Sequence, residues 1–162
     1  MSQPGIDEFI LFEHPNYTGR TRRFALKDFV SGVVHSFSGT DLQDRASAVR
    51  WRLSPGQVVT LTEHNRQPTL PDLSEIGRTV DLIGDGNVRE RNLDNQDTSD
   101  CLSAFFWRHV DLSRGRVIFY KDGSYKNFQQ TIFIAEWPVN RAHNISKWAI
   151  QDRMSSVQWV DL

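Results

Sequence analysis

The stretch LQDRASAVRWRL, from Leu42 to Leu53, contains a pattern that returns twice along the chain. An aspartate is followed after two residues by a serine, and after three more by a tryptophan. The three copies are Asp44, Ser47 and Trp51; Asp100, Ser103 and Trp107; and Asp152, Ser155 and Trp159. A recurrence of this kind is typical of a protein built from copies of one structural unit.

The first and third copies also agree upstream of this pattern. FEHPNYTG (Phe12 to Gly19) corresponds to YKDGSYKN (Tyr120 to Asn127). The two segments are separated by 108 residues, the same offset that separates Asp44 from Asp152. The head of the middle copy, LTEHN (Leu61 to Asn65), lacks the aromatic-x-Gly ending and is followed by a long polar loop, 66–77. The chain is therefore predicted to consist of three related units, of which the middle one is the most divergent.

Alternation of apolar and polar residues predicts the secondary structure. Val49, Trp51 and Leu53 fall on one face of an extended segment, which indicates a half-buried strand. The recurring tryptophans are accordingly expected in the core. No long segment has helical periodicity, so the chain is predicted to be all-β. The expected strands cover Glu8 to Glu13, Thr21 to Leu26, Ala48 to Leu53, Gln57 to Thr62, Arg116 to Tyr120 and Gln130 to Ala135.

Composition excludes several classes of protein. The 162 residues include 19 basic and 20 acidic ones, a balance that argues against nucleic-acid binding through bulk positive charge. The lone Cys101 rules out an intrachain disulfide and a cysteine zinc cluster. No apolar run reaches the length that spans a membrane. The segment Met1 to Asp7 has no signal-peptide pattern, so we expect a cytoplasmic protein, or a secreted one if a signal peptide has been removed.

The hairpin and corner motifs resemble those of the βγ-crystallin family. The residues that carry the resemblance are Phe12-Glu13 with Tyr17-x-Gly19, followed by DRASAV, and Tyr120 with Tyr125-x-Asn127, followed by QDRMSS. The family has an aromatic hairpin with a glycine, then an Asn/Asp-Asn/Asp-x-x-Ser/Thr-Ser segment. The resemblance implies Greek-key units of four strands, which pair two by two into a β-sandwich.

Three such units predict an uneven division of the chain. Residues 8–112 would form a domain of two Greek-key units, 8–53 and 57–112, and residues 116–162 a third unit. A second molecule would supply the missing partner of the third unit, giving a homodimer. Three repeats of about 54 residues also fit a β-trefoil, which remains the alternative fold.

The resemblance further implies calcium binding at the repeated acidic segments. Calcium takes six to eight oxygen ligands, and the candidate ligands are Asp44 with Ser47, Asp100 with Ser103, and Asp152 with Ser155. Gln43, Ser99 and Gln151 replace the first Asn/Asp of the family segment. Arg45 and Arg153 stand beside the carboxylates and would repel a cation, so any site is expected to be weak. Alternatively, these side chains only form hydrogen bonds that hold the local backbone.

No catalytic signature accompanies these motifs. HExxH, GxSxG and phosphate-binding loops are absent from the sequence, and the five histidines are scattered. We therefore expect a non-enzymatic protein that binds calcium weakly and has a structural or stress-protective role. The alternative is a calcium-independent binding module, either a trefoil-like lectin or a proteinase inhibitor that presents loop 66–77.

Overall fold

Three antiparallel β-sheets make up the protein. The computed structural model describes residues 3–94, 98–123, 129–137, 145–150, 154 and 156–160. The strands in these ranges are β1 (Glu8–Phe12), β2 (Thr21–Ala25), β3 (His35–Ser36), β4 (Ala48–Arg52), β5 (Gln57–Thr62), β6 (Thr79–Ile83), β7 (Val88–Asn92), β8 (Ala104–His109), β9 (Arg116–Tyr120), β10 (Gln129–Phe133) and β11 (Ser156–Val160). Short 3-10 helices follow β2, β8 and β10: η1 (Leu26–Asp28), η3 (Leu112–Arg114) and η4 (Ile134–Glu136).

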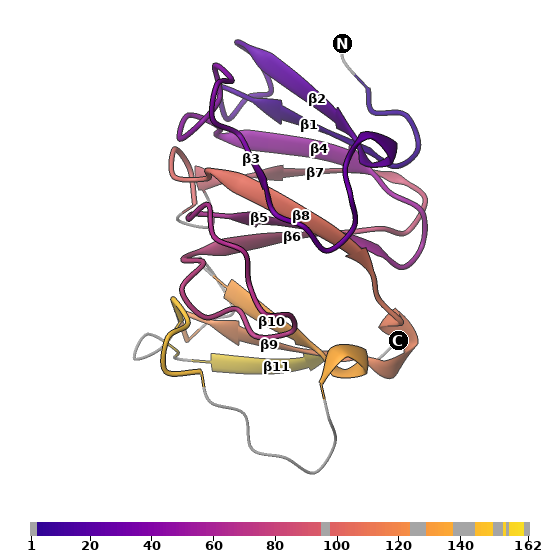
Figure 1. Ribbon diagram of the computed structural model, residues 1–162, viewed down its shortest axis with the longest axis vertical. Coiled ribbons are helices and arrows are strands. Elements are labelled where there is room, and N and C mark those ends of the chain that lie inside the picture. Colours follow the sequence, from indigo (N-terminus) through magenta and orange to yellow (C-terminus); the bar gives the residue numbers. More distant parts are fainter. Residues whose placement is uncertain are drawn as a thin grey trace.

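The first two units exchange one strand each. Sheet A has the strand order β2-β1-β4-β7, so its fourth strand comes from the second unit. Sheet B has the order β3-β8-β5-β6, so its strand β3 comes from the first unit. Because each sheet contains three strands of one unit and one of the other, the two units form a single interlocked Greek-key sandwich (Figure 1).

The main core lies between sheets A and B. Phe9 and Leu11 on β1, Val49 on β4, Leu61 on β5 and Phe105 on β8 are fully buried in one cluster. Phe105 meets the ring of Phe9 edge-on, with the ring centroids 5.0 Å apart. The alternation in the sequence thus predicts the buried face correctly, since every second residue of these strands points between the sheets.

Sheet order decides between the two folds expected from the sequence. The all-β Greek-key sandwich is confirmed, and the predicted strands β5 and β9 agree residue for residue with the structure. The β-trefoil alternative is wrong, because the first two units interlock with each other while the third forms the separate sheet C, of order β10-β9-β11.

The third unit packs against the second. Figure 1 shows sheet C at one end of the long axis, with β10 next to β6. Trp148 and Ile150 of the third unit share a buried cluster with Leu73 and Ile76 of loop 66–77. The Trp148 indole N–H also donates to Asp72 Oδ1 at 2.7 Å. Leu73 and Ile76 of the enlarged loop are therefore covered by the third unit, whereas Arg66, Gln67, Thr69 and Glu75 of the same loop stay exposed.

A buried polar network ties the third unit to β8. Arg108 donates to both carboxylate oxygens of Glu136, at 3.0 and 2.9 Å, and to the Thr60 hydroxyl at 2.6 Å. The Thr60 hydroxyl in turn donates to Asp81 Oδ1 at 2.6 Å. Burial raises the pKa of Asp81, and the nearby Arg108 and the hydrogen bond from Thr60 oppose this shift. Charge pairing thus accompanies apolar packing at this junction.

The three repeated tryptophans have unlike surroundings. Trp51 is buried in the main core and Trp107 packs against it. Trp159 is 59% exposed, so the prediction of a core position is wrong for the third copy. The strand is the same in all three units, but burial of its inner face requires a second sheet opposite it. Among the described residues, no sheet covers β11 in that way.

Candidate metal centre

The acidic segments form two corners that lead into β4 and β8. We call residues 42–47 the first corner and residues 98–103 the second corner. Asp44 and Asp100 both have positive backbone φ angles, 53° and 57°. Aspartate tolerates this left-handed conformation better than most residues, because its short side chain can form local hydrogen bonds. The recurring aspartate therefore has a conformational role in the turn, whether or not it also binds a metal ion.

Backbone hydrogen bonds join the two corners reciprocally. The Asp44 N–H donates to the Leu102 carbonyl at 3.1 Å, and the Asp100 N–H donates to the Ala46 carbonyl at 3.0 Å. Ala46 and Leu102 are each two residues beyond the aspartate of their own corner. The same contact is thus made in both directions, as expected for two similar units related by a pseudo-twofold axis.

The repeated serines have equivalent backbone partners. The Ser47 N–H donates to the carbonyl of Phe12, the last residue of β1, at 2.9 Å. The Ser103 N–H donates to the carbonyl of Thr62, the last residue of β5, at 2.8 Å. Each corner is therefore fastened to the first strand of its own unit as well as to the opposite corner.

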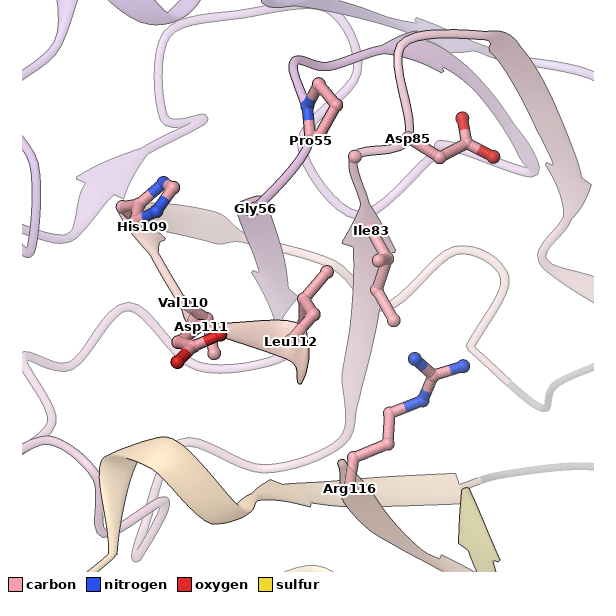
Figure 2. A pocket seen from close by; sticks show the side chains of 10 residues that line it. Pro55, Gly56, Ile83, Asp85, His109, Val110, Asp111, Leu112 and Arg116 are labelled. Carbon is pink, nitrogen blue, oxygen red and sulfur yellow. The ribbon is translucent and has the colours of Figure 1, made fainter. Parts of the chain in front are cut away.

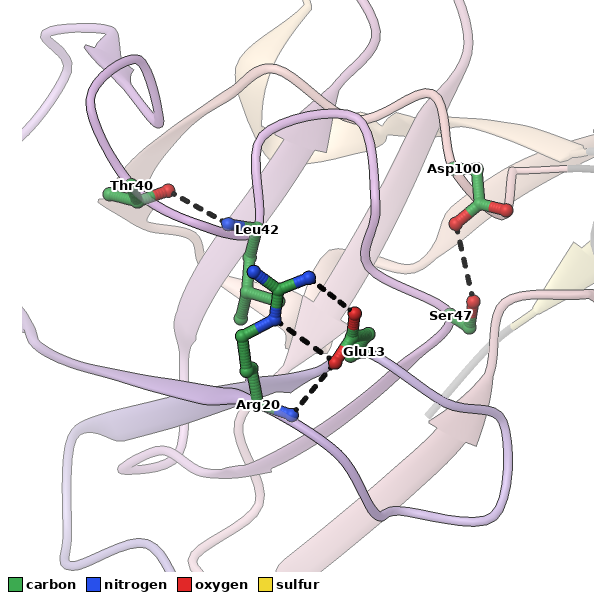
Figure 3. A network of polar contacts seen from close by, with 6 residues as sticks. All are labelled: Glu13, Arg20, Thr40, Leu42, Ser47 and Asp100. Atoms are coloured by element: carbon green, nitrogen blue, oxygen red, sulfur yellow. Dashed lines mark hydrogen bonds and ion pairs between the residues drawn. The ribbon is translucent and has the colours of Figure 1, made fainter.

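The aspartate and serine side chains pair between units rather than within one. The Ser103 hydroxyl donates to Asp44 Oδ1 at 2.6 Å. The Ser47 hydroxyl donates to Asp100 Oδ1 at 3.4 Å, a long contact that Figure 3 shows. Ser99 donates to the Ser47 oxygen at 3.0 Å. Asp44 with Ser47, and Asp100 with Ser103, were expected as sets within one unit, and the observed partners are exchanged. Asp152 and Ser155 lie outside the described residues.

Comparisons with known proteins give one kind of similarity. No protein-family model matches the chain. No curated protein matches it. A solved structure described as "Evolution of the eye lens beta-gamma-crystallin domain fold" resembles it with a TM-score of 0.48 and 17% sequence identity. The similarity covers 68% of this chain and 94% of that chain.

Strand order and corner contacts within this chain specify the fold of the first two units. They consist of four strands each and pair about a pseudo-twofold axis, as the hairpin and corner motifs imply. The first two units therefore have the paired Greek-key arrangement that the resemblance to βγ-crystallins implies, and we call them the crystallin-like domain. The third unit supplies a further three-stranded sheet outside this crystallin-like domain.

A glutamate–arginine pair closes each hairpin of the crystallin-like domain. Arg20 donates through Nε, Nη2 and its backbone N–H to the Glu13 carboxylate, at 3.2, 2.7 and 3.0 Å (Figure 3). These hydrogen bonds lower the pKa of Glu13 to about 2. Arg78 binds Glu63 in the same way, with its backbone N–H 2.8 Å from Glu63 Oε2. Both carboxylates are therefore engaged by guanidinium groups and are poor candidates for cation binding.

The second hairpin ends with the same backbone conformation as the first, although it lacks the aromatic residue of the aromatic-x-Gly pattern. Glu75 and Tyr17 have similar positive φ angles, 66° and 62°, and each stands two residues before a glycine, Gly77 or Gly19. A Gly-Arg-Thr triplet follows at both places, from Gly19 and from Gly77. This triplet would have identified the equivalence. It was hidden because the second hairpin is longer and has glutamate where the first has an aromatic residue.

The corners fit calcium only as sparse sites. Each would supply one carboxylate and one hydroxyl oxygen, Asp44 with Ser103 and Asp100 with Ser47. Both aspartates are exposed, so water could complete the six to eight ligands. Across the described ranges, no three His, Cys, Asp or Glu side chains come together as metal ligands. The oxygens present are of the type that calcium prefers, but each corner supplies only two of the six to eight ligands.

A pocket of about 620 Å³ lies where the second unit joins the third (Figure 2). Its walls include Ile83 on β6, Leu112 in η3 and Arg116 on β9. Arg116 Nε is buried without a hydrogen-bond partner. The carboxylates of the lining residues Asp85 and Asp111 are engaged by Arg89 and Ser113. The pocket therefore combines an apolar wall with Arg116 and His109, and its lining residues include no Ser, Thr, Cys or Lys nucleophile.

In the described part of the chain, no helix is long and apolar enough to cross a membrane.

Proposed function

We propose that the chain is a non-enzymatic βγ-crystallin-like protein that binds calcium weakly at its two corners. The observation that supports this proposal most is the exchange of partners between the units. The Asp44 carboxylate of the first unit and the Ser103 hydroxyl of the second lie 2.6 Å apart. A cation that bound the Asp44 carboxylate and the Ser103 hydroxyl in place of this hydrogen bond would contact both units at once. Calcium is the ion that favours such neutral and anionic oxygen ligands together.

The proposed affinity is low for reasons that the sequence already contains. Gln43 and Ser99 stand where a second carboxylate or amide oxygen would strengthen each corner. Arg45 directly follows Asp44 and is exposed, so its charge reduces the attraction for a divalent cation. We therefore expect binding in the millimolar range, as is found for extracellular calcium modules at about 10⁻⁴ to 10⁻³ M.

The expected consequence of binding is greater stability. Any ligand that binds only the folded state raises the free energy of unfolding, by about 1.4 kcal/mol at a tenfold excess over its Kd. Because each corner joins two units, the bound ion would oppose their separation. A structural or stress-protective role would depend on this property, since the fold is otherwise held by its core and by side-chain hydrogen bonds.

Calorimetry tests the proposal directly. The melting temperature is measured with excess chelator and with 5 to 10 mM calcium, which is about tenfold over the proposed Kd. A third measurement replaces calcium by magnesium at equal ionic strength. Calcium should raise the midpoint by about 2–5 °C and magnesium by less. Asp44→Asn and Asp100→Asn should each reduce the increase, and the double variant should abolish it. Asp28→Asn, at an exposed position outside the corners, is the matched control. Identical melting curves with and without calcium would refute calcium binding.

A further inference from the structure

Strand β11 exposes residues whose counterparts are buried. Val157 and Trp159 are 47% and 59% exposed, whereas Val49 and Trp51, at the same repeat positions on β4, are 0% and 5% exposed. Val157 and Trp159 are two residues apart and therefore lie on one face of the strand. Met154 is exposed nearby along the chain. Such a concentration of large apolar side chains on one short segment is typical of an interaction surface.

The edge of sheet C lacks the neighbour that the other sheets have. β4 is followed in sheet A by β7, and β8 is followed in sheet B by β3. Each of these added strands comes from the partner unit. β11 is the counterpart of β4 and β8, and among the described residues its one paired neighbour is β9. In the part of the chain that the structure describes, the backbone N–H and C=O groups on its other side have no strand partner.

The other sheet edges carry charge, are covered, or, at β3 (His35–Ser36), extend over two residues only. The edge strand β2 contains Arg22 and Arg23, and the edge strand β7 contains Arg89, Glu90 and Arg91. Charged edges deter unwanted pairing between sheets. β6 lies next to β10 of the third unit. β11 reads SVQWV and has no charged residue, although it is exposed. This strand thus lacks the protection that the chain places elsewhere.

Within the described residues, the chain covers only part of the sheet C face that carries Phe119, Val157 and Trp159. Phe119 on β9 and Ile132 on β10 pack against the cluster of Trp148, Ile150 and loop 66–77. Val157 and Trp159, on the strand farthest from β6 in the sheet order, remain outside this cluster. The exposed surface therefore continues an apolar interface that already exists between the second and third units.

We propose that the β11 face, defined by Val157 and Trp159, is the interface through which two copies of this chain form a dimer. The counterpart faces of the first and second units are covered by another copy of the same repeat. The repeat that remains unmatched in the chain is the third unit, and a second molecule provides its equivalent. Contact of this face with itself across a twofold axis gives a closed, isologous dimer.

Oligomeric state measured against concentration tests the proposal. Light scattering after size exclusion and sedimentation equilibrium should show a dimer of the full chain. Trp159→Lys and Val157→Lys should each raise the dissociation constant about tenfold or more. Val88→Lys, at a residue 43% exposed on β7, is the matched control and should leave the dimer unchanged. A chain that stays monomeric at millimolar concentration, or a dimer unaffected by the two β11 changes, overturns the proposal.

Hydrogen exchange on the unaltered protein provides a second measurement, in case a variant fails to fold. Amides of residues 156–160 should exchange more slowly at high than at low protein concentration, because dimer formation covers them. The amides of β2, an edge strand protected by arginines, should show no dependence on concentration. Concentration-independent exchange in β11 would contradict a dimer at this face. The same result would also rule out protection of β11 by another segment of the chain that moves over it when two molecules associate.

Discussion

Arg108 and Glu136 form a bidentate ion pair between the crystallin-like domain and the third unit. The Arg108 side chain is 11% exposed and that of Glu136 is 18% exposed. The same guanidinium group lies over the rings of Phe106 and Phe133, 5.0 and 5.3 Å from their centroids. One side chain of β8 thus contacts η4 and β10 together. This arrangement makes attachment of the third unit sensitive to a single carboxylate.

Loss of that carboxylate should loosen the third unit. Glu136→Gln leaves the mostly buried Arg108 charge without its anion, which should cost about 2–3 kcal/mol of unfolding free energy. The change is measured by urea denaturation. Asp85→Asn removes one partner of the Asp85–Arg89 pair, whose side chains are largely exposed, and should cost less than about 0.5 kcal/mol. Equal effects of the two substitutions would contradict the role assigned to Arg108 and Glu136.

The second hairpin should depend on glycine for two separable reasons. Gly39 and Gly77 both have positive φ angles, 81° and 75°. An added Cβ at Gly39 meets no atom within 4 Å, whereas one at Gly77 would lie 2.7 Å from the Glu63 Cβ. Gly39→Ala should therefore cost about 1 kcal/mol, from the backbone conformation alone. Gly77→Ala should cost clearly more, and thermal unfolding of both variants measures the difference. Equal costs would contradict the close approach at Glu63.

The exchanged pairing of the corners predicts a specific coupling. In a double-mutant cycle without calcium, Asp44→Ala and Ser103→Ala should show a coupling energy of about 0.5–1 kcal/mol, because they remove one shared hydrogen bond. Asp44→Ala and Ser47→Ala should be nearly additive, since these side chains bond to different partners. Urea unfolding gives both values. Coupling of Asp44 with Ser47 but not with Ser103 would mean that the pairs form within units.

The six strands expected from the sequence all form, although the expectation did not include β3, β6 and β7. Alternation predicts that Val49 and Trp51 of β4 face the main core, because a strand has only two faces. The partner of each corner could not be predicted in the same way. Asp44 and Ser47 lie close in sequence, which favours a local pair, but the pseudo-twofold axis brings Ser103 nearer to the carboxylate. Long-range symmetry of this kind leaves no local signal.

Burial of the third tryptophan also lay beyond sequence reasoning. Trp51 and Trp159 follow identical spacings, yet their exposed fractions differ because one has a facing sheet and the other does not. A repeat predicts the unit but not what is packed against it. The longer second hairpin was misread for a related reason, since Glu75 replaces the aromatic residue that marks the first one.

Acid should weaken the first hairpin through Glu13. Hydrogen bonds from the Arg20 side chain and backbone lower the pKa of Glu13 from 4.5 to about 2. A carboxylate with a lowered folded-state pKa stabilises the fold above its unfolded pKa, and this contribution is lost as the pH falls through the folded value. The difference in melting temperature between the natural protein and Glu13→Gln should therefore be largest above pH 4.5 and should vanish near pH 2. Because the pair is exposed, high salt should reduce the difference. A difference that is independent of pH would show that Glu13 acts through its shape and not through its charge.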